Sequence, residues 1–135
     1  MDVKIKRTHP DAVIPFKTYD DDFCYDCVAV SCEEIAPNVY KYGLGIALQI
    51  DRDKENTYAL MLKDAHGNGV LAKKYESWQL SIDFRPRSSV WETGMVLSNC
   101  NGTIDELYTG EISAVFYHVM PNMPKYEVGD RKSVV

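Results

Sequence analysis

The chain has 135 residues, of which 45% are hydrophobic and 26% are charged, and its formal net charge is -5. This length predicts a single domain over residues 1–135. The acidic balance excludes the basic surface that nucleic-acid binding needs, although it leaves room for a small anion-binding pocket. No stretch is apolar enough to span a bilayer, and the charged N-terminus is unlike a secretory signal. We therefore expect a cytoplasmic protein with reduced cysteines.

The first half of the chain contains strand signals and one hairpin signal. Residues 44–50 are β-prone and partly alternate between apolar and small or polar side chains. Residues 57–62 and 69–75 flank a Gly- and Asn-rich break at 64–69. Such a break between two apolar runs predicts a β-hairpin.

The second half repeats the strand pattern more clearly. Residues 79–84 alternate, which places Leu80, Ile82 and Phe84 on one face of a strand. Residues 111–119 combine β-branched and aromatic side chains and form the strongest strand signal in the chain.

Helical periodicity is confined to one short segment. Ser88 and Ser89 are expected to cap a short helix over 90–93, and Gly94 is expected to end it. Many short strands separated by turn residues, with so little helix, predict an all-β sandwich, barrel or jelly roll.

The four cysteines have one suggestive spacing. Cys24 and Cys27 form a Cys-x-x-Cys pair, which is half of a zinc site or a redox pair. Cys32 and Cys100 are isolated in the sequence, whereas zinc sites usually have a second close pair. The pattern favours four small buried hydrophobic side chains over a metal site.

A polar segment bounded by glycines precedes the strand at 111–119. Gly102 and Gly110 bracket an Ile-Asp-x-x-Tyr sequence. Glycine lets a backbone approach a ligand closely, Asp105 there suits the orientation of a water, and Tyr108 offers a flat surface to a ring. A hairpin that merely carries polar residues explains the same pattern.

A second polar segment, Pro86-Arg87-Ser88-Ser89, lies at the start of the predicted helix. Free N–H groups at a helix start and the donor fork of Arg87 both suit a phosphate. An ordinary helix start with a surface arginine is the alternative.

Together these segments resemble the trimeric dUTPase family, in motifs that follow the family's order over nearly the whole chain. Residues 22–29 stand where the first motif belongs, 86–89 with Gly94 match the second, 102–111 match the third and most specific, and 129–131 begin the fourth. The resemblance implies a jelly-roll (β-clip) subunit with one short helix. It also implies a homotrimer with active sites between subunits, which hydrolyses dUTP to dUMP and pyrophosphate.

The resemblance further implies a role for each matching residue. Asp105 would activate the water that attacks the α-phosphorus, Tyr108 would lie under the deoxyribose, and Asp26 would help place Mg²⁺ through bound waters. The remaining residues would bind substrate, the phosphates by Arg87, Ser88 and Ser89 and the uracil edge by Asn99, Gly102, Thr103 and Ile104.

The sequence departs from the family pattern in three places. Phe23, Cys24 and Cys27 replace residues of the first motif, which alters the corner expected to place Mg²⁺. A hairpin insertion is expected within 51–79, as a decoration or a partner-binding arm. The glycine-rich fifth motif is missing, so that the sequence is truncated, a partner supplies the closing segment, or the site works open.

Two other functions share these features. A dCTP deaminase-like enzyme needs an acid or base beside C4 of cytosine, for which Glu111 is the nearby candidate, although Glu111 also fits the dUTPase motif. A nucleotide-binding regulatory protein with weakened catalysis would account for the altered first motif and the missing fifth. Asp105 and Tyr108 together favour the enzyme.

Overall fold

The structure is a computed structural model of the chain, and it describes residues 2–51, 58–63, 69–75 and 80–134. Within these ranges the elements are nearly all strands, as the sequence predicts. In chain order they are β1 (Asp2–Arg7), β2 (Asp26–Val28), β3 (Ser31–Ala36), β4 (Val39–Asp51), β5 (Tyr58–Lys63), β6 (Gly69–Tyr75), β7 (Ser81–Pro86), the 3₁₀-helix η1 (Ser88–Thr93), β8 (Met95–Leu97), β9 (Gly102–Asp105), β10 (Glu111–His118) and β11 (Arg131–Val134).

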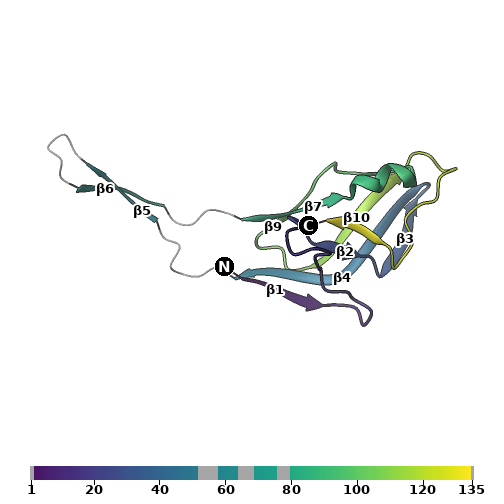
Figure 1. Cartoon of the computed structure of the whole chain (residues 1–135), viewed down its shortest axis with the longest axis horizontal. Helices are drawn as coiled ribbons and strands as arrows, with labels where there is room; N and C mark the ends of the chain where they lie inside the picture. Colours follow the sequence, from purple (N-terminus) through teal and green to yellow (C-terminus); the bar gives the residue numbers. More distant parts are fainter. Residues whose placement is uncertain (1, 52–57, 64–68, 76–79, 135) are drawn as a thin grey trace.

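Two sheets form the body of the molecule, a sandwich of the jelly-roll type (Figure 1). In the larger sheet β4 pairs with β10 along one edge, while β1 and β3 share its other edge end to end. β8 extends this sheet beyond β10. The second sheet has the order β2-β11-β7-β9, which joins strands from distant parts of the chain.

The core lies between the sheets and takes its largest side chains from β4 and β10. Tyr42 and Ile46 on β4 and Phe116 on β10 are almost fully buried. β10 confirms the strand predicted at 111–119, and it alternates buried and exposed residues along most of its length. Phe84 and Ile82 of β7 pack against the same core, which confirms the predicted face for these two residues; Leu80 lies before the strand, which begins at Ser81, and outside the core cluster.

β4 is longer than the strand predicted at 44–50, because its glycines serve packing rather than ending the strand. A Cβ at Gly43 would lie 2.5 Å from Ser31 Oγ and 2.8 Å from Glu111 Oε1. Gly45 has a φ of +66° and adjoins the irregular register between β4 and β10. Only glycine fits such a crowded, left-handed position without strain.

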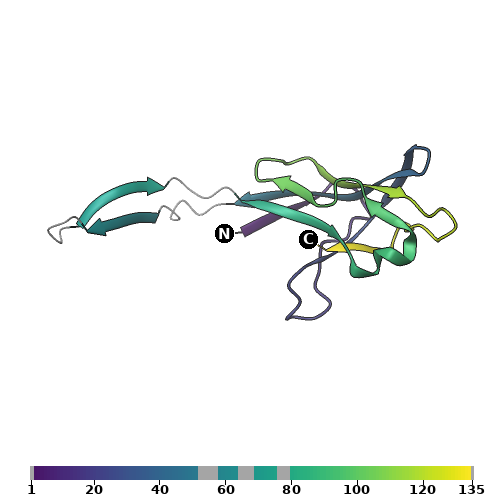
Figure 2. The same cartoon turned by 90° about the horizontal axis from the view of Figure 1, so that it is seen from above.

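The expected hairpin is present and stands away from the sandwich. β5 and β6 pair antiparallel, from Tyr58↔Tyr75 to Lys63↔Gly69. In both Figure 1 and Figure 2 this pair lies apart from the two sheets, as an arm. Most of the predicted turn at 64–69 lies outside the described residues.

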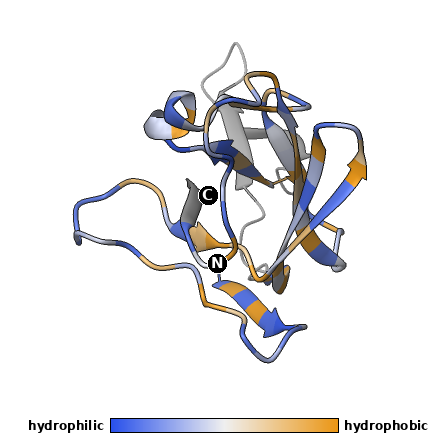
Figure 3. Ribbon diagram, turned by 90° about the vertical axis from the view of Figure 1, so that its right-hand side faces the viewer, coloured by the Kyte–Doolittle hydropathy of each residue, from blue (hydrophilic) through white to orange (hydrophobic). Residues whose placement is uncertain are grey.

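β1 is an edge strand with the alternation expected of a half-exposed position. Figure 3 shows alternating apolar and polar bands along the strand next to the N-terminus. Val3 and Ile5 carry the apolar bands, and every residue of the strand is exposed. Lys4 pairs with Asp51 of β4 at 2.8 Å, which adds a surface charge at this edge.

The short helix differs from its prediction at its start. η1 includes Ser88 and Ser89 instead of being capped by them, and Arg87 is the residue before its first turn, with no side-chain cap. The backbone of Arg87, which follows Pro86, is still extended, and the helix begins at the next residue, Ser88. Gly94 ends it with a φ of 63°, as predicted. Within the described ranges no helix is long or apolar enough to cross a membrane.

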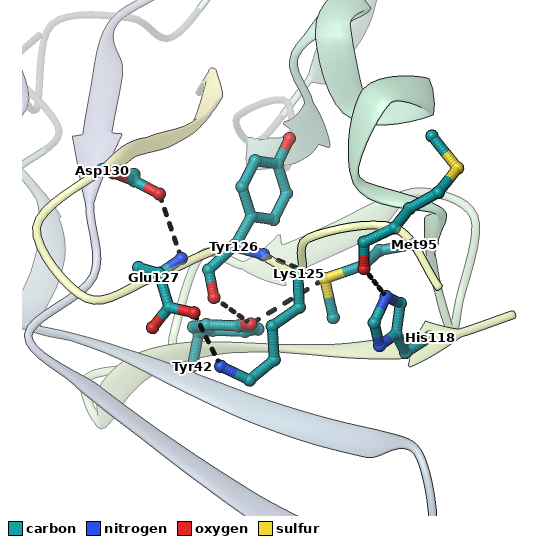
Figure 4. A network of polar contacts seen from close by, with 8 residues as sticks. Tyr42, Met95, His118, Lys125, Tyr126, Glu127 and Asp130 are labelled. Carbon is teal, nitrogen blue, oxygen red and sulfur yellow. Dashed lines mark hydrogen bonds and ion pairs between the residues drawn. The ribbon is translucent and has the colours of Figure 1, made fainter. Parts of the chain in front are cut away.

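Residues 119–130 return across the core and lead into β11 (Figure 4). Tyr42 donates a hydrogen bond to the carbonyl of Tyr126 at 2.8 Å, and burial raises the pKa of the Tyr42 hydroxyl so that it remains a donor. His118 Nε2 lies 2.9 Å from the carbonyl of Met123. These contacts hold the segment that places β11 between β2 and β7.

The cysteines only partly match the expected buried set. Cys27 is 1% exposed, whereas Cys24 and Cys32 are half-buried and Cys100 is exposed, so the prediction is wrong for Cys100. The reason is local, because Cys100 occupies a turn with a φ of 58°. Among the described residues no group of three or more metal-binding side chains converges.

Cys27 should make the protein less stable in alkali. Burial, helped by the negative charge of Asp26, raises the pKa of the Cys27 thiol from 9.0 to about 12. The unfolded chain releases this proton first, so stability is full below about pH 9 and falls as pH rises towards 12. We expect a loss of about 1 kcal/mol between about pH 9 and about pH 10.

Urea unfolding under reducing conditions at several pH values measures this slope. Cys27→Ala should flatten it, and Cys100→Ala, at an exposed position, should leave it unchanged. Equal slopes in the parent and in Cys27→Ala would contradict the assignment.

Candidate active site

One cavity gathers most of the residues singled out by the sequence. Its volume is about 300 Å³, and it lies between β9, the turn before it and the start of β10. Six of the candidate residues line it: Asn99, Gly102, Thr103, Ile104, Asp105 and Tyr108. The cavity therefore unites the residues expected to contact base, sugar and attacking water.

β9 forms one wall and is held in place by β7. The two strands pair from Phe84↔Gly102 to Ser81↔Asp105, and Ile104 packs against the core. β9 is the last strand in the order of its sheet, so among the described strands only β7 pairs with it. Its other edge therefore offers backbone donors and acceptors to a ligand.

Asn99 lies at the tight turn that precedes β9. The turn is closed by hydrogen bonds from Cys100 N–H to Leu97 O (3.1 Å) and from Asn101 N–H to Asn99 O (2.5 Å). A Cβ at Gly102 would lie 3.6 Å from the Asn99 side-chain nitrogen. The Asn99 amide therefore lies beside the start of β9, and both line the cavity.

Tyr108 is fixed by one hydrogen bond from its backbone and one from its side-chain hydroxyl. Its N–H donates to Asp105 O at 3.0 Å, closing the turn after β9, and its hydroxyl donates to Glu111 O at 2.9 Å. A Cβ at Gly110 would lie 2.6 Å from the Tyr108 hydroxyl oxygen and 2.8 Å from its ring. Gly110 is therefore required for the ring to lie where it does, and Tyr108 is a preformed flat surface.

Asp105 is the last residue of β9 and its side chain is exposed. Its backbone is held by the pairing with Ser81 and by the turn bond to Tyr108. Within the described part of the chain no hydrogen bond or ion pair engages its carboxylate. A carboxylate that is fixed through its backbone but open at its oxygens can accept a proton from water.

The other four candidates lie elsewhere. Ser88 and Ser89 are exposed at the start of η1, beside Arg87. Arg87 Nη1 lies 2.5 Å from Asp26 Oδ1. Asp26 is only 6% exposed, and its other oxygen accepts a hydrogen bond from the Thr18 hydroxyl at 3.1 Å. This group is organised around a buried ion pair.

The surroundings of Asp26 do not fit a magnesium site in this conformation. Mg²⁺ and the waters it carries need oxygen ligands that face the ion. Both Asp26 oxygens are directed at protein donors, Arg87 and Thr18, and the carboxylate is buried. Asp26 is arranged here as a partner for Arg87.

Asp105 and Arg87 lie at opposite ends of β7. Asp105 pairs with Ser81, the first residue of β7, and Arg87 follows Pro86, the last. A strand rises about 3.3 Å per residue, so Ser81 and Arg87 are about 20 Å apart. Arg87 does not line the cavity that holds Asp105, although Phe84, three residues before it on β7, does.

A second cavity, of about 710 Å³, is larger, but much of its wall is apolar. Apolar side chains from β1, β4, β7 and the loop before β2 form much of its wall, including Val3, Ile5, Phe23, Leu48 and Ile82. It contains none of the candidate residues. The smaller cavity is therefore the better candidate active site.

The contact of Thr18 with Asp26 had no sequence signal. Thr18 lies in no motif, and it reaches Asp26 because the loop folds back through the bridge between Phe16 and Asp26. Gly110 was visible in the sequence as part of a motif, but its steric relation to Tyr108 appears only in the structure.

The sequence matches no known protein-family model and no curated protein. Solved structures, in contrast, include clear matches to phage dUTPases. The dUTPase of Staphylococcus bacteriophage 80alpha, in a variant form, aligns with a TM-score of 0.65 at 14% identity over 98% of this chain and 86% of that chain. Another variant of it, solved with dUpNHpp, aligns with a TM-score of 0.64 at 15% identity over 98% and 79%.

The dUTPase of phage phi11 of S. aureus aligns with a TM-score of 0.57 at 15% identity, over 88% of this chain. This chain spans only 60% of that protein's length. At these identities the likeness establishes the fold: the chain has the fold of the phage dUTPases. A variant of the phi11 protein is described with a structural Mg(II) ion.

Proposed function

We propose that this chain is a dUTP diphosphatase, which converts dUTP and water into dUMP and pyrophosphate. The main support is the single cavity that collects Asn99, the β9 backbone, Asp105 and Tyr108, on a fold shared with phage dUTPases. Some of those neighbours were solved with the nucleotide analogue dUpNHpp. The substrate proposed here is therefore a deoxyuridine triphosphate.

In this proposal the free edge of β9 and the amide of Asn99 pair with the edge of uracil, as a partner base does. In this proposal a close fit of the uracil against β9 leaves no room for the methyl group of thymine. Tyr108 lies under the deoxyribose, where a 2′-hydroxyl would collide with it. Asp105 orients a water towards the α-phosphorus and takes its proton as attack begins.

Phosphoryl transfer depends mainly on alignment and on neutralisation of charge. Arg87, Ser88 and Ser89 supply donors for the phosphates in this proposal. Because Arg87 does not line the cavity and is about 20 Å from Asp105 along β7, we propose that these donors come from a second copy of the chain. A homotrimer with its sites between subunits satisfies this requirement.

Magnesium is implied by the resemblance and by the Mg(II) ion of a phi11 variant. When present it would neutralise phosphate charge. No step is assigned to it, because Asp26, the residue expected to place it, faces Arg87 and Thr18.

Release of pyrophosphate from dUTP by the purified chain tests the proposal. We expect turnover of dUTP and little turnover of dTTP or UTP. A chain that binds dUpNHpp but releases no pyrophosphate from dUTP would overturn the enzyme and support a binding protein.

Replacement of Tyr108 should weaken discrimination between sugars. Tyr108→Ala removes the surface expected to exclude a 2′-hydroxyl, so the preference for dUTP over UTP in kcat/KM should fall on the order of tenfold. Tyr117→Ala is the matched control, because Tyr117 is similarly exposed (46% against 49%) but lies outside the cavity. An unchanged preference in Tyr108→Ala would remove Tyr108 from the sugar site.

Two other functions are weighed against hydrolysis. The 80alpha dUTPases are described as controlling the transfer of virulence genes, which supports a regulatory nucleotide-binding role as the second candidate. A deaminase-like reaction is less well supported. Glu111, its candidate acid or base, accepts the N–H of Gly45 at 3.2 Å and so anchors β10 to β4.

A further inference from the structure

The strand that carries Asp105 is held by a short ladder. β9 and β7 form only the pairs Phe84↔Gly102, Asp83↔Thr103, Ile82↔Ile104 and Ser81↔Asp105. Asp105 takes part in the last of these pairs, and the ends of short ladders open most readily. Precise placement of the Asp105 carboxylate therefore needs a further restraint at this end.

Glu106 supplies such a restraint. Its Oε2 accepts the backbone N–H of Leu80 at 3.3 Å, in a partly buried position. Leu80 precedes β7 and Glu106 follows β9, so this bond crosses the ladder one step beyond Ser81↔Asp105. The side chain thus replaces the backbone partner that a longer strand would have provided.

Glu106 lies in the turn that follows β9. Asp105 O accepts the N–H of Tyr108 at 3.0 Å, which leaves Glu106 and Leu107 as the central residues of the turn. Leu107 is 91% exposed and gives the turn no anchor, whereas Glu106 points back to β7. The bond to Leu80 therefore ties the turn that follows Asp105 to the start of β7.

The same bond connects the site to the arm. The chain re-enters the sandwich from the β5–β6 hairpin at Leu80, immediately before β7. The position of Glu106 is one that the motif Gly-x-Ile-Asp-x-x-Tyr leaves open. We propose that Glu106 is a positioning residue that fixes Asp105 by fastening its strand end to the base of the arm. This inference rests on the proposed function.

The test compares Glu106→Ala, Glu106→Gln and Glu92→Ala. Glutamine keeps an oxygen acceptor of the same reach, and Glu92 is an exposed glutamate on η1 outside the cavity. In Glu106→Ala we expect kcat for dUTP to fall about tenfold with KM changed less than about twofold, because a misplaced base slows chemistry more than binding. Glu106→Gln and Glu92→Ala should both stay within about twofold of the parent.

Hydrogen exchange gives a readout that does not need activity. The Leu80 amide should exchange about tenfold faster in Glu106→Ala than in the parent and the other two variants, because its acceptor is gone. If the parent hydrolyses no dUTP, the proposed function and the link to catalysis both fail, and Leu80 exchange alone then decides whether Glu106 holds the strand end. Unchanged kcat in Glu106→Ala, or an equal loss in Glu106→Gln, overturns the proposal.

Shortening the far end of the arm is a second control. Replacement of residues 64–69 by a two-residue turn leaves Leu80 and Glu106 in place. We expect its rate to stay within a few fold of the parent, since loops of this kind tolerate change. A large loss of rate with faster Leu80 exchange, although Glu106 is unchanged, would show that Glu106 alone does not hold this strand end and would overturn the inference.

Discussion

Asp105→Asn is expected to hydrolyse dUTP at least about 10²-fold more slowly than the parent while binding the nucleotide nearly as well, because a positioned general base contributes on the order of 10²- to 10⁴-fold. Asparagine keeps the size of the side chain and its turn, since the turn bond to Tyr108 uses the backbone of Asp105. What is lost is the ability to take a proton from water.

Two measurements separate chemistry from binding. Titration with dUpNHpp reports binding, and pyrophosphate release from dUTP reports turnover. Asp51→Asn is the control, because Asp51 is exposed in a surface ion pair with Lys4, far from the cavity along β4. Near-normal turnover in Asp105→Asn would refute the role of Asp105, whereas a parallel loss of dUpNHpp binding would indicate a damaged site.

Local composition and turn signals were enough to predict several of the strands. β10 was recognisable because it is rich in β-branched and aromatic residues, and β5 and β6 because a glycine-rich break separates two apolar runs. The first part of β4 was missed, because the predicted strand began at Leu44, after Gly43. In the structure, Ser31 and Glu111 lie too close to Gly43, and His9 too close to Gly45, for a larger side chain.

Motif order identified the candidate residues but not their grouping. Which strand lies beside which depends on contacts between distant residues, such as the pairing of β11 with β2 and β7, and no local pattern encodes these. The separation of Arg87 from Asp105 follows from the register of β7 and β9, which becomes known only when the sheet is built. The same holds for Asp26, whose partner Thr18 is brought in by a folded loop.

Asp26 is the residue for which sequence and structure suggest different roles. The resemblance implies that it places Mg²⁺ through water, and the structure pairs it with Arg87. The two roles make different predictions for a protein without metal. A metal-only carboxylate is dispensable to the stability of the metal-free fold, whereas one half of a buried ion pair is not.

Asp26→Ala should therefore destabilise the metal-free protein by about 2–3 kcal/mol, because it leaves Arg87 without its acceptor. This lies below the usual loss for a fully buried pair, since the Arg87 side chain is 34% exposed and partly solvated. Thr18→Val removes only the weaker neutral donor and should lose about 1 kcal/mol. Asp21→Ala, in an exposed turn, should be nearly neutral.

Urea unfolding in EDTA and again in Mg²⁺ distinguishes the two roles, and a double-mutant cycle with Arg87→Ala isolates the pair. If the ion pair dominates, the loss in Asp26→Ala is present in EDTA, and the cycle gives a coupling free energy of about 1–2 kcal/mol. If Asp26 serves only magnesium, the variant matches the parent in EDTA and falls behind it only when Mg²⁺ is added. The second pattern, with additive effects in the cycle, would return Asp26 to the metal and leave Arg87 to be held by other contacts.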